Sequence, residues 1–239
     1  MPTKRLHYLD IARAIAIFSI VLGHTIAYST HCYEIYRFIF AFSVPLFFVL
    51  SGMTFRLKEE TTWQFIKRKF LRIMIPYFVW AILFLVPYYL FGSNFSSELS
   101  QPNLLGVLYG SGANSALKQN TPLWFLPALF TTELLYYFLL KIFRHPKTPY
   151  FLLPAVIILG YLSTILLNNV FLPWGINSAL TIGVFFYLGY LLKNYNFKPL
   201  FIALLFIVGI VGSYSVCVAD YSCKSSYINI CYYGFVYAL

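Results

Sequence analysis

Residues 13–24 read RAIAIFSIVLGH, with a guanidinium at one end of an apolar segment and an imidazole at the other. The segment lies in a longer apolar run suited to cross a membrane, where burying either group in lipid is costly. Eleven residues at about 100° each return an α-helix to within about 20° of its starting direction. Arg13 and His24 are therefore predicted to share one helix face, about 16 Å apart along the axis, where both can line one cavity.

The composition around this segment is that of an integral membrane protein. Of the 239 residues, 60% are hydrophobic and 10% are charged, whereas a soluble domain carries about 25% charged residues. Apolar runs long enough to cross a bilayer predict an all-α polytopic protein with about eight transmembrane helices in a single domain over residues 1–239. We expect the eighth helix, and so the domain, to be incomplete at the C-terminus. The predicted spans are 9–30, 35–55, 73–92, 122–140, 150–167, 178–192, 199–218 and 227–239.

The basic residues predict which side of the membrane each loop faces. The N-terminus and alternate loops hold thirteen Lys and Arg, against three on the other side, which places the N-terminus in the cytoplasm. The net charge of +10 is then mostly a topology signal and does not indicate nucleic-acid binding. The thirteen are Lys4, Arg5, Arg56, Lys58, Lys67, Arg68, Lys69, Arg72, Lys141, Arg144, Lys147, Lys193 and Lys198, and the three are Arg37, Lys118 and Lys224.

The long loop predicted on the non-cytoplasmic side, from about Ser93 to Thr121, is rich in Ser, Asn and Gly and suits contact with a polar partner. Cys32 and Cys223 are predicted on the same side, where an oxidising compartment would allow a disulfide, although the sequence does not set their distance. No spacing typical of metal ligands, such as CxxC or HExxH, occurs. We therefore expect no metal.

Four ionisable residues inside the predicted spans are candidate functional residues, because such groups are rare and costly within a membrane. They are Asp10, Arg13 and His24 in the first span and Glu133 in the fourth. Asp10 and Arg13 are three residues apart and can pair on one helix face. Alternatively, Asp10 caps the helix N-terminus and Arg13 extends to the membrane interface. The sequence leaves both readings open.

His24 lies in IVLGHTIAY, too deep in the first span for an ordinary loop residue. Imidazole titrates near neutral pH, which makes His24 a candidate general base. The alternative is a core histidine satisfied by hydrogen bonds. Glu133 could pair with His24 or Arg13 and fix the imidazole tautomer, provided that the two helices touch.

The segment from Thr61 to Tyr77, TTWQFIKRKFLRIMIPY, combines apolar residues with a basic cluster. Trp63, Ile66 and Phe70 recur at helical spacing, which predicts an interfacial amphipathic helix leading into the third span. The cluster either attracts anionic lipid or docks a phosphorylated cofactor. Its cations are Lys67, Arg68, Lys69 and Arg72.

Four stretches together resemble a known family of membrane proteins. YLDIARAIAIFSIVLGH, FSVPLFFVLSGMTF, KRKFLRIMIPYFVW and LWFLPALFTTELL are similar to acyltransferase family 3, most of all to its fucose 4-O-acetylase-like branch. The most specific piece is the family's Arg-x10-His pattern, which Arg13 and His24 match. The Ser51-Gly52 pair is a common but weak family feature, since small residues also serve helix packing. The resemblance covers about the first 140 residues, and the rest only by hydropathy.

The resemblance implies a bacterial inner-membrane O-acyltransferase, embedded in the lipid bilayer, with cytoplasmic acetyl-CoA or another acyl-CoA as donor. The acceptor would be a carbohydrate hydroxyl in a cell-surface or periplasmic glycan. His24 would be the catalytic histidine and Arg13 its partner in the acyl-CoA channel. The family's Arg-x-x-Arg motif, associated with the CoA phosphates, falls on Lys69 and Arg72, with Lys in place of the first Arg. Arg68 could substitute for it.

Family members usually have about ten spans, whereas this chain stops within its eighth. The sequence is therefore also compatible with an inactive truncated remnant. A transporter that uses Arg13, His24 and Glu133 as a coordination or proton path is a further alternative, although transporters more often show internal repeats and none is visible. The acceptor sugar, the acyl group, the oligomeric state and the choice between direct transfer and an acyl-histidine relay stay open.

Overall fold

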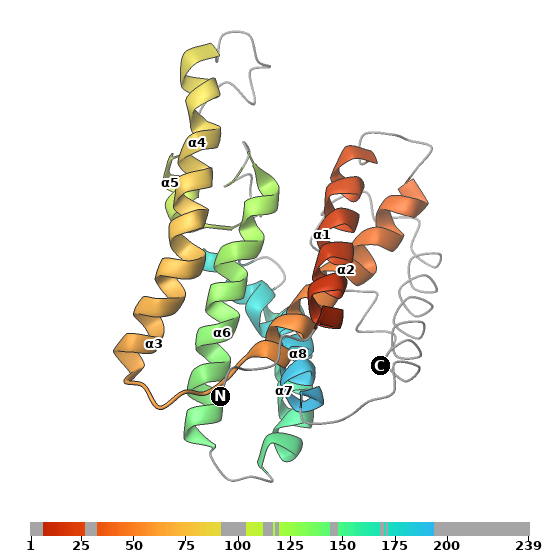
Figure 1. Cartoon of the computed structure of the whole chain (residues 1–239), viewed down its shortest axis with the longest axis vertical. Helices are drawn as coiled ribbons and strands as arrows, with labels where there is room; N and C mark the ends of the chain where they lie inside the picture. Colours follow the sequence, from red (N-terminus) through yellow and green to blue (C-terminus); the bar gives the residue numbers. More distant parts are fainter. Residues whose placement is uncertain are drawn as a thin grey trace. The chain divides into compact units, whose positions relative to one another are not determined.

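The computed structural model confirms the all-helical class for the part of the chain that it describes (Figure 1). Four helices there are long and apolar enough to cross a membrane: His7–Thr25, Thr62–Phe91, Pro122–Ile142 and Pro173–Leu192. Shorter apolar helices, Phe42–Thr54 and Leu152–Leu166, fall in two other predicted spans. The described residues are 7–26, 33–91, 104–111, 117, 120–143, 148–167, 170 and 172–193.

Several predictions fall outside these residues. The predicted spans 199–218 and 227–239 are not among them, and neither are Cys32 and Cys223. The chain divides into two compact units, of which the first comprises residues 1–55 and 184–239 and the second residues 56–183. The division falls within helix α8 (Ile176–Leu192).

The first unit is built on α1 (His7–Ile26) and α2 (Tyr33–Thr54). The buried residues of α1 are Leu9, Ala16 and Gly23, and this seven-residue spacing is the narrow seam of closely packed helices. Gly23 leaves room for α2, because a Cβ there would lie 2.5 Å from the Phe40 ring. Most other α1 side chains are half-buried or exposed, as expected of a helix that faces lipid.

The end of α2 crosses α8 with backbone against backbone. A Cβ on Gly52 would lie 1.9 Å from the carbonyl oxygen of Phe186, and one on Gly189 would lie 2.0 Å from that of Val49. Small residues allow this approach between membrane helices. Lys193 donates to the carbonyl of Phe55 at 3.1 Å just past the end of α2.

The second unit begins with one continuous helical stretch made of α3 (Thr62–Lys69), the π-helical segment η2 (Phe70–Met74) and α4 (Ile75–Phe91) (Figure 1). Thr61 and Gln64 form a reciprocal capping box that starts α3. The wider π turn comes immediately before Pro76, which has no N–H to give to the preceding turn. The predicted amphipathic segment is thus helical and runs directly into a span.

Helix α6 (Phe125–Ile142) follows the 3-10 turn η4 (Thr121–Trp124) and contributes much of the second unit's core. Helix α7 (Thr148–Leu166) and the 3-10 turn η5 (Pro173–Gly175) lead into α8. Ser163 of α7 and Thr181 of α8 share a buried hydrogen bond of 3.0 Å. The core cluster consists of Met74, Tyr77, Ala81, Leu85, Val107, Leu117 and Phe130.

The loop predicted between 93 and 121 contains a helix that composition did not reveal, α5 (Leu104–Tyr109). Tyr77 donates to the carbonyl of Val107 at 2.6 Å, and the Trp174 indole donates to that of Leu108 at 2.9 Å. Trp174 has a positive φ of 54°, and its carbonyl accepts from Thr131 at 2.9 Å. The apolar run LLGVLY within the polar loop is the signal that could have predicted this helix.

Candidate active site

Arg13 is held at the start of the first unit by two different helices. Its guanidinium donates to the hydroxyl of Thr54 on α2 at 3.0 Å and lies 3.7 Å from the carboxylate of Asp10. The predicted Asp10–Arg13 pair is therefore confirmed. The alternative that Asp10 caps the helix is wrong, because α1 begins at His7 and Asp10 lies within its first turn, where a carboxylate still favours the helix dipole.

Thr54 is a site contact that the sequence analysis missed. Its hydroxyl donates to the carbonyls of Leu50 and Ser51, at 3.0 and 3.2 Å, while it accepts from Arg13. This leaves the hydroxyl oxygen oriented towards Arg13. The position follows the Ser51-Gly52 pair, whose glycine serves the close crossing with α8. The pair therefore has a structural role in the first unit.

His24 lies near the C-terminal end of α1 and is half-buried. Its ring packs edge-on against Phe40 of α2, with the centroids 5.0 Å apart. Within the described ranges it makes no hydrogen bond, so the alternative of a core histidine satisfied by hydrogen bonds finds no support there. The imidazole nitrogens keep their capacity to accept or donate a proton.

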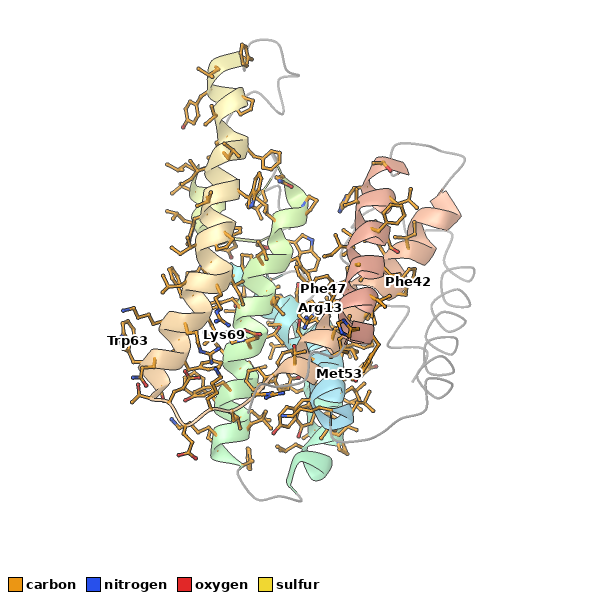
Figure 2. All side chains as sticks on the ribbon, viewed as in Figure 1. Arg13, Phe42, Phe47, Met53, Trp63 and Lys69 are labelled. Atoms are coloured by element: carbon orange, nitrogen blue, oxygen red, sulfur yellow. The ribbon has the colours of Figure 1, made fainter. Side chains whose placement is uncertain are left out.

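Glu133 has a different partner from either one that the sequence suggested. It is buried midway along α6, in the second unit, and each carboxylate oxygen lies 2.7 Å from the ammonium of Lys69. The geometry suits a hydrogen bond to Oε1, whereas Oε2 has no hydrogen-bond partner. Figure 2 shows Lys69 on the side of its helix that faces α6. The expected partners, His24 and Arg13, belong to the first unit.

The basic cluster thus divides into paired and exposed cations. Arg68 donates from Nε to Glu60 at 3.2 Å and also bonds that carboxylate through Nη2. The Arg68 hydrogen bond holds the pKa of Glu60 below its ordinary value. Lys67 and Arg72 are exposed. Trp63 is 70% exposed and points away from α6 (Figure 2), as an amphipathic interfacial helix requires.

A polar stripe on α6 also went unnoticed in the sequence. Glu133, Tyr137 and Lys141 are spaced by four and therefore share one helix face. Lys141 donates to the Thr62 hydroxyl at 2.6 Å and to the Tyr137 hydroxyl at 3.4 Å, and Tyr137 stacks on Phe65 with centroids 3.9 Å apart. Together with Lys69–Glu133, these contacts join α3 and α6 as antiparallel neighbours. The spacing of polar residues in an otherwise apolar helix could have revealed them.

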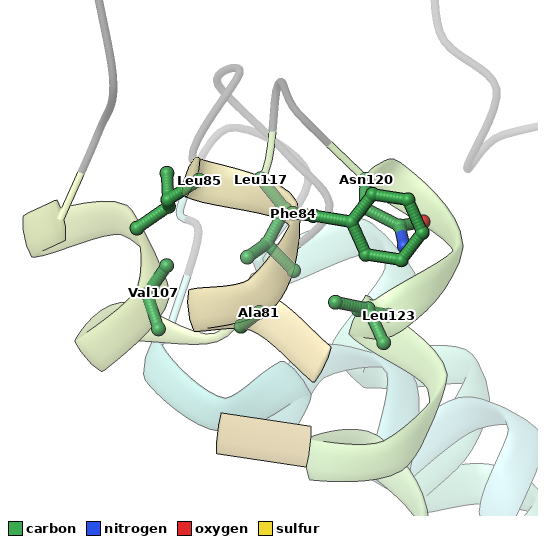
Figure 3. Close-up of a pocket in the computed structure, with 7 residues that line it drawn as sticks. All are labelled: Ala81, Phe84, Leu85, Val107, Leu117, Asn120 and Leu123. Carbon is green, nitrogen blue, oxygen red and sulfur yellow. The ribbon is translucent and has the colours of Figure 1, made fainter. Parts of the chain in front are cut away.

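A pocket in the second unit lies between α4, α5 and the segment before α6 (Figure 3). It contains none of the predicted site residues. Asn120 is its one polar lining residue, and a mostly apolar lining offers little chemistry. Its lining residues are Ala81, Phe84, Leu85, Val107, Leu117, Asn120 and Leu123.

A family model described as an acyltransferase domain, Acyl_transf_3, matches residues 6–238. The chain belongs to this acyltransferase family. Comparisons with curated proteins and with solved structures give no match. The family model matches this membrane acyltransferase well past residue 140. The motifs quoted from the sequence end near that residue, and beyond it only the hydropathy resembles the family. The family match favours an enzyme over the transporter that the sequence left as an alternative. In the described residues no group of His, Cys, Asp and Glu could hold a metal ion.

Proposed function

We propose that the protein is an O-acyltransferase that uses acyl-CoA, most simply acetyl-CoA, and modifies a carbohydrate hydroxyl of a cell-surface or periplasmic glycan. The family assignment supports acyl transfer. Cations on the predicted cytoplasmic side, including the exposed Lys67 and Arg72, suit the phosphates of CoA. We place the enzyme in a bacterial inner membrane, on the basis of its resemblance to fucose 4-O-acetylase-like proteins.

The state of His24 is the observation that carries the proposal. An imidazole in a membrane-spanning helix, half-buried and without a hydrogen bond in the described residues, is costly unless it is used. His24 accepts the proton of the acceptor hydroxyl, the oxygen attacks the thioester carbonyl, the carbon–sulfur bond breaks, and the leaving CoA thiolate takes up the proton from the His24 imidazolium. Arg13 supplies positive charge on the same helix, oriented by Thr54.

The test is acyl transfer from radiolabelled acetyl-CoA by purified protein and by its His24→Gln variant. Glutamine keeps hydrogen-bonding ability but is not basic, so we expect label transfer to glycan to fall by about 10²–10⁴-fold. The variant should insert and accumulate as the original protein does. His24→Ala should be equally inactive. Turnover by His24→Gln near that of the original protein would exclude His24 as the base.

Thr25→Val provides a matched control beside His24. Among the described residues, the Thr25 hydroxyl donates to the carbonyl of Leu22 one turn earlier, at 2.7 Å, and to no other group, and the side chain is exposed. Its loss should leave transfer within about twofold, since exposed substitutions change stability by about 0.5 kcal/mol or less. If Thr25→Val lost as much acyl transfer as His24→Gln, the effect of His24→Gln would be explained by damage to the end of α1 and not by loss of the base.

A further inference from the structure

The ammonium of Lys141 is fixed at the point where the end of α6 meets the start of α3. It lies 2.6 Å from Oγ1 of Thr62 and 3.4 Å from Oη of Tyr137. Tyr137 is itself buried and stacked on the fully buried Phe65, and the Lys141 ammonium lies 5.4 Å from the centre of the Tyr137 ring. The charge is therefore held in one place by rigid aromatic groups.

The hydrogen bonds among Lys141, Thr62 and Tyr137 use up the acceptor capacity of the Thr62 oxygen and leave two protons to donate. Lys141 has three N–H protons, of which two go to the hydroxyls of Thr62 and Tyr137. The Thr62 oxygen accepts from Lys141 at 2.6 Å and from Tyr137 at 3.5 Å, which uses both of its lone pairs. Among the described residues no further partner takes the O–H proton of Thr62 or the third proton of Lys141, so both can be donated to an acceptor.

The electrostatics favour an anion as that acceptor. No carboxylate among the described residues forms an ion pair with Lys141, in contrast to Lys69 and Arg68. Thr62 is the first residue of α3, so the positive end of that helix dipole adds to the charge of Lys141. All of these groups lie on the predicted cytoplasmic side.

We propose that Lys141, Thr62 and Tyr137 form a binding site for a phosphate ester, and that this ester belongs to the CoA moiety of the acyl donor. The assignment to CoA rests on the proposed function. It is supported by the pairing pattern: Glu133 and Glu60 already neutralise Lys69 and Arg68, whereas Lys141 is held by hydroxyls and can add to the phosphate contacts of the exposed Lys67 and Arg72. An anionic lipid headgroup presents the same chemistry and is the competing source.

The experiment compares binding of CoA and of pantetheine, which lacks the phosphates, to protein in phosphatidylcholine nanodiscs. Lys141→Gln should weaken CoA binding by about tenfold to a hundredfold, as expected for a charge-assisted hydrogen bond, and should leave pantetheine binding unchanged. Lys141→Arg should retain most of the affinity. Tyr137→Phe, which keeps the stacked ring, should weaken CoA binding by a smaller factor. Lys58→Gln, which removes an exposed cation, is the matched control.

The outcomes separate the sources. If Lys141→Gln keeps the original ratio of CoA to pantetheine affinity while folded, the phosphate site is excluded and the proposed function stands. If the variant instead loses phosphatidylglycerol from mixed nanodiscs, measured by native mass spectrometry, with CoA binding intact, the site binds lipid and the assignment to the donor is wrong. If the original protein binds no CoA, the proposed function fails as well.

Discussion

Cations meet carboxylates at the surface in the first unit and in the interior in the second. Arg13 bonds a hydroxyl at 3.0 Å and lies 3.7 Å from a carboxylate, with both charged side chains more than a third exposed. Lys69 lies 2.7 Å from the carboxylate of Glu133, whose side chain is 8% exposed. The helices also join differently, through glycine backbones in the first unit and through aromatic and charged side chains in the second. A buried ion pair helps to join α3 and α6, whereas the charged pair on α1, where we place the chemistry, stays accessible.

The largest expected effect is on the second unit. Lys69→Met would leave the buried Glu133 carboxylate without its cation, and removing one partner of a buried pair costs about 3–5 kcal/mol. Thermal unfolding in detergent should show this loss, and hydrogen exchange should rise in α3 and α6 more than in α1 and α2. The double variant Lys69→Met with Glu133→Met should recover most of the stability, because two apolar residues can replace a buried pair.

Lys67→Met is the control for this experiment. It removes the same charge from the same helix at an exposed position, and should change stability by about 0.5 kcal/mol or less. A similar loss in both single variants would show that helix charge, and not the Glu133 pair, stabilises the α3–α6 contact. The contrast between the two units would then lose its basis.

Substitution of the glycine where α2 crosses α8 in the first unit should have an intermediate effect on stability. Gly52→Ala places a methyl group against the Phe186 carbonyl, 1.9 Å from the nearest atom, so α2 and α8 must separate at a cost of about 1–3 kcal/mol or more. Gly23→Ala meets the Phe40 ring edge and a methyl group of Ile39, which are side-chain atoms that can shift, so it should cost less. Unfolding midpoints of the two variants measure the difference. Equal midpoints would mean that the backbone crossing carries no special constraint.

The smallest effect concerns pH and the Arg68–Glu60 pair. Because Arg68 lowers the pKa of Glu60 in the folded protein, the pair's contribution is fully present above the ordinary carboxyl pKa of about 4.3. It is lost as the pH falls through the folded-state value. Glu60→Gln should therefore reduce stability at neutral pH, by about 1 kcal/mol or less, and should match the original protein in acid. Midpoints that differ equally at both pH values would contradict this assignment.

The family-like motifs and the ionisable residues could be read from the sequence because each depends on a short stretch. The eleven-residue spacing of Arg13 and His24, the Asp10–Arg13 pair and the helical reading of Thr61–Tyr77 are local consequences of helix periodicity. Hydropathy likewise predicts apolar helices without any knowledge of neighbours. The polar stripe from Glu133 to Lys141 belongs to the same class, since a spacing of four was sufficient to predict a shared face.

Only the tertiary structure decided which groups meet. Glu133 pairs with Lys69, 64 residues away in the chain, and Thr54 orients Arg13 from 41 residues away; no local pattern selects these partners. The role of Gly52 also depends on Phe186 and Gly189, which hydropathy treats as ordinary span residues. A sequence pattern fixes the face on which a side chain lies. The partner depends on which helix packs against that face, and long-range packing determines that choice.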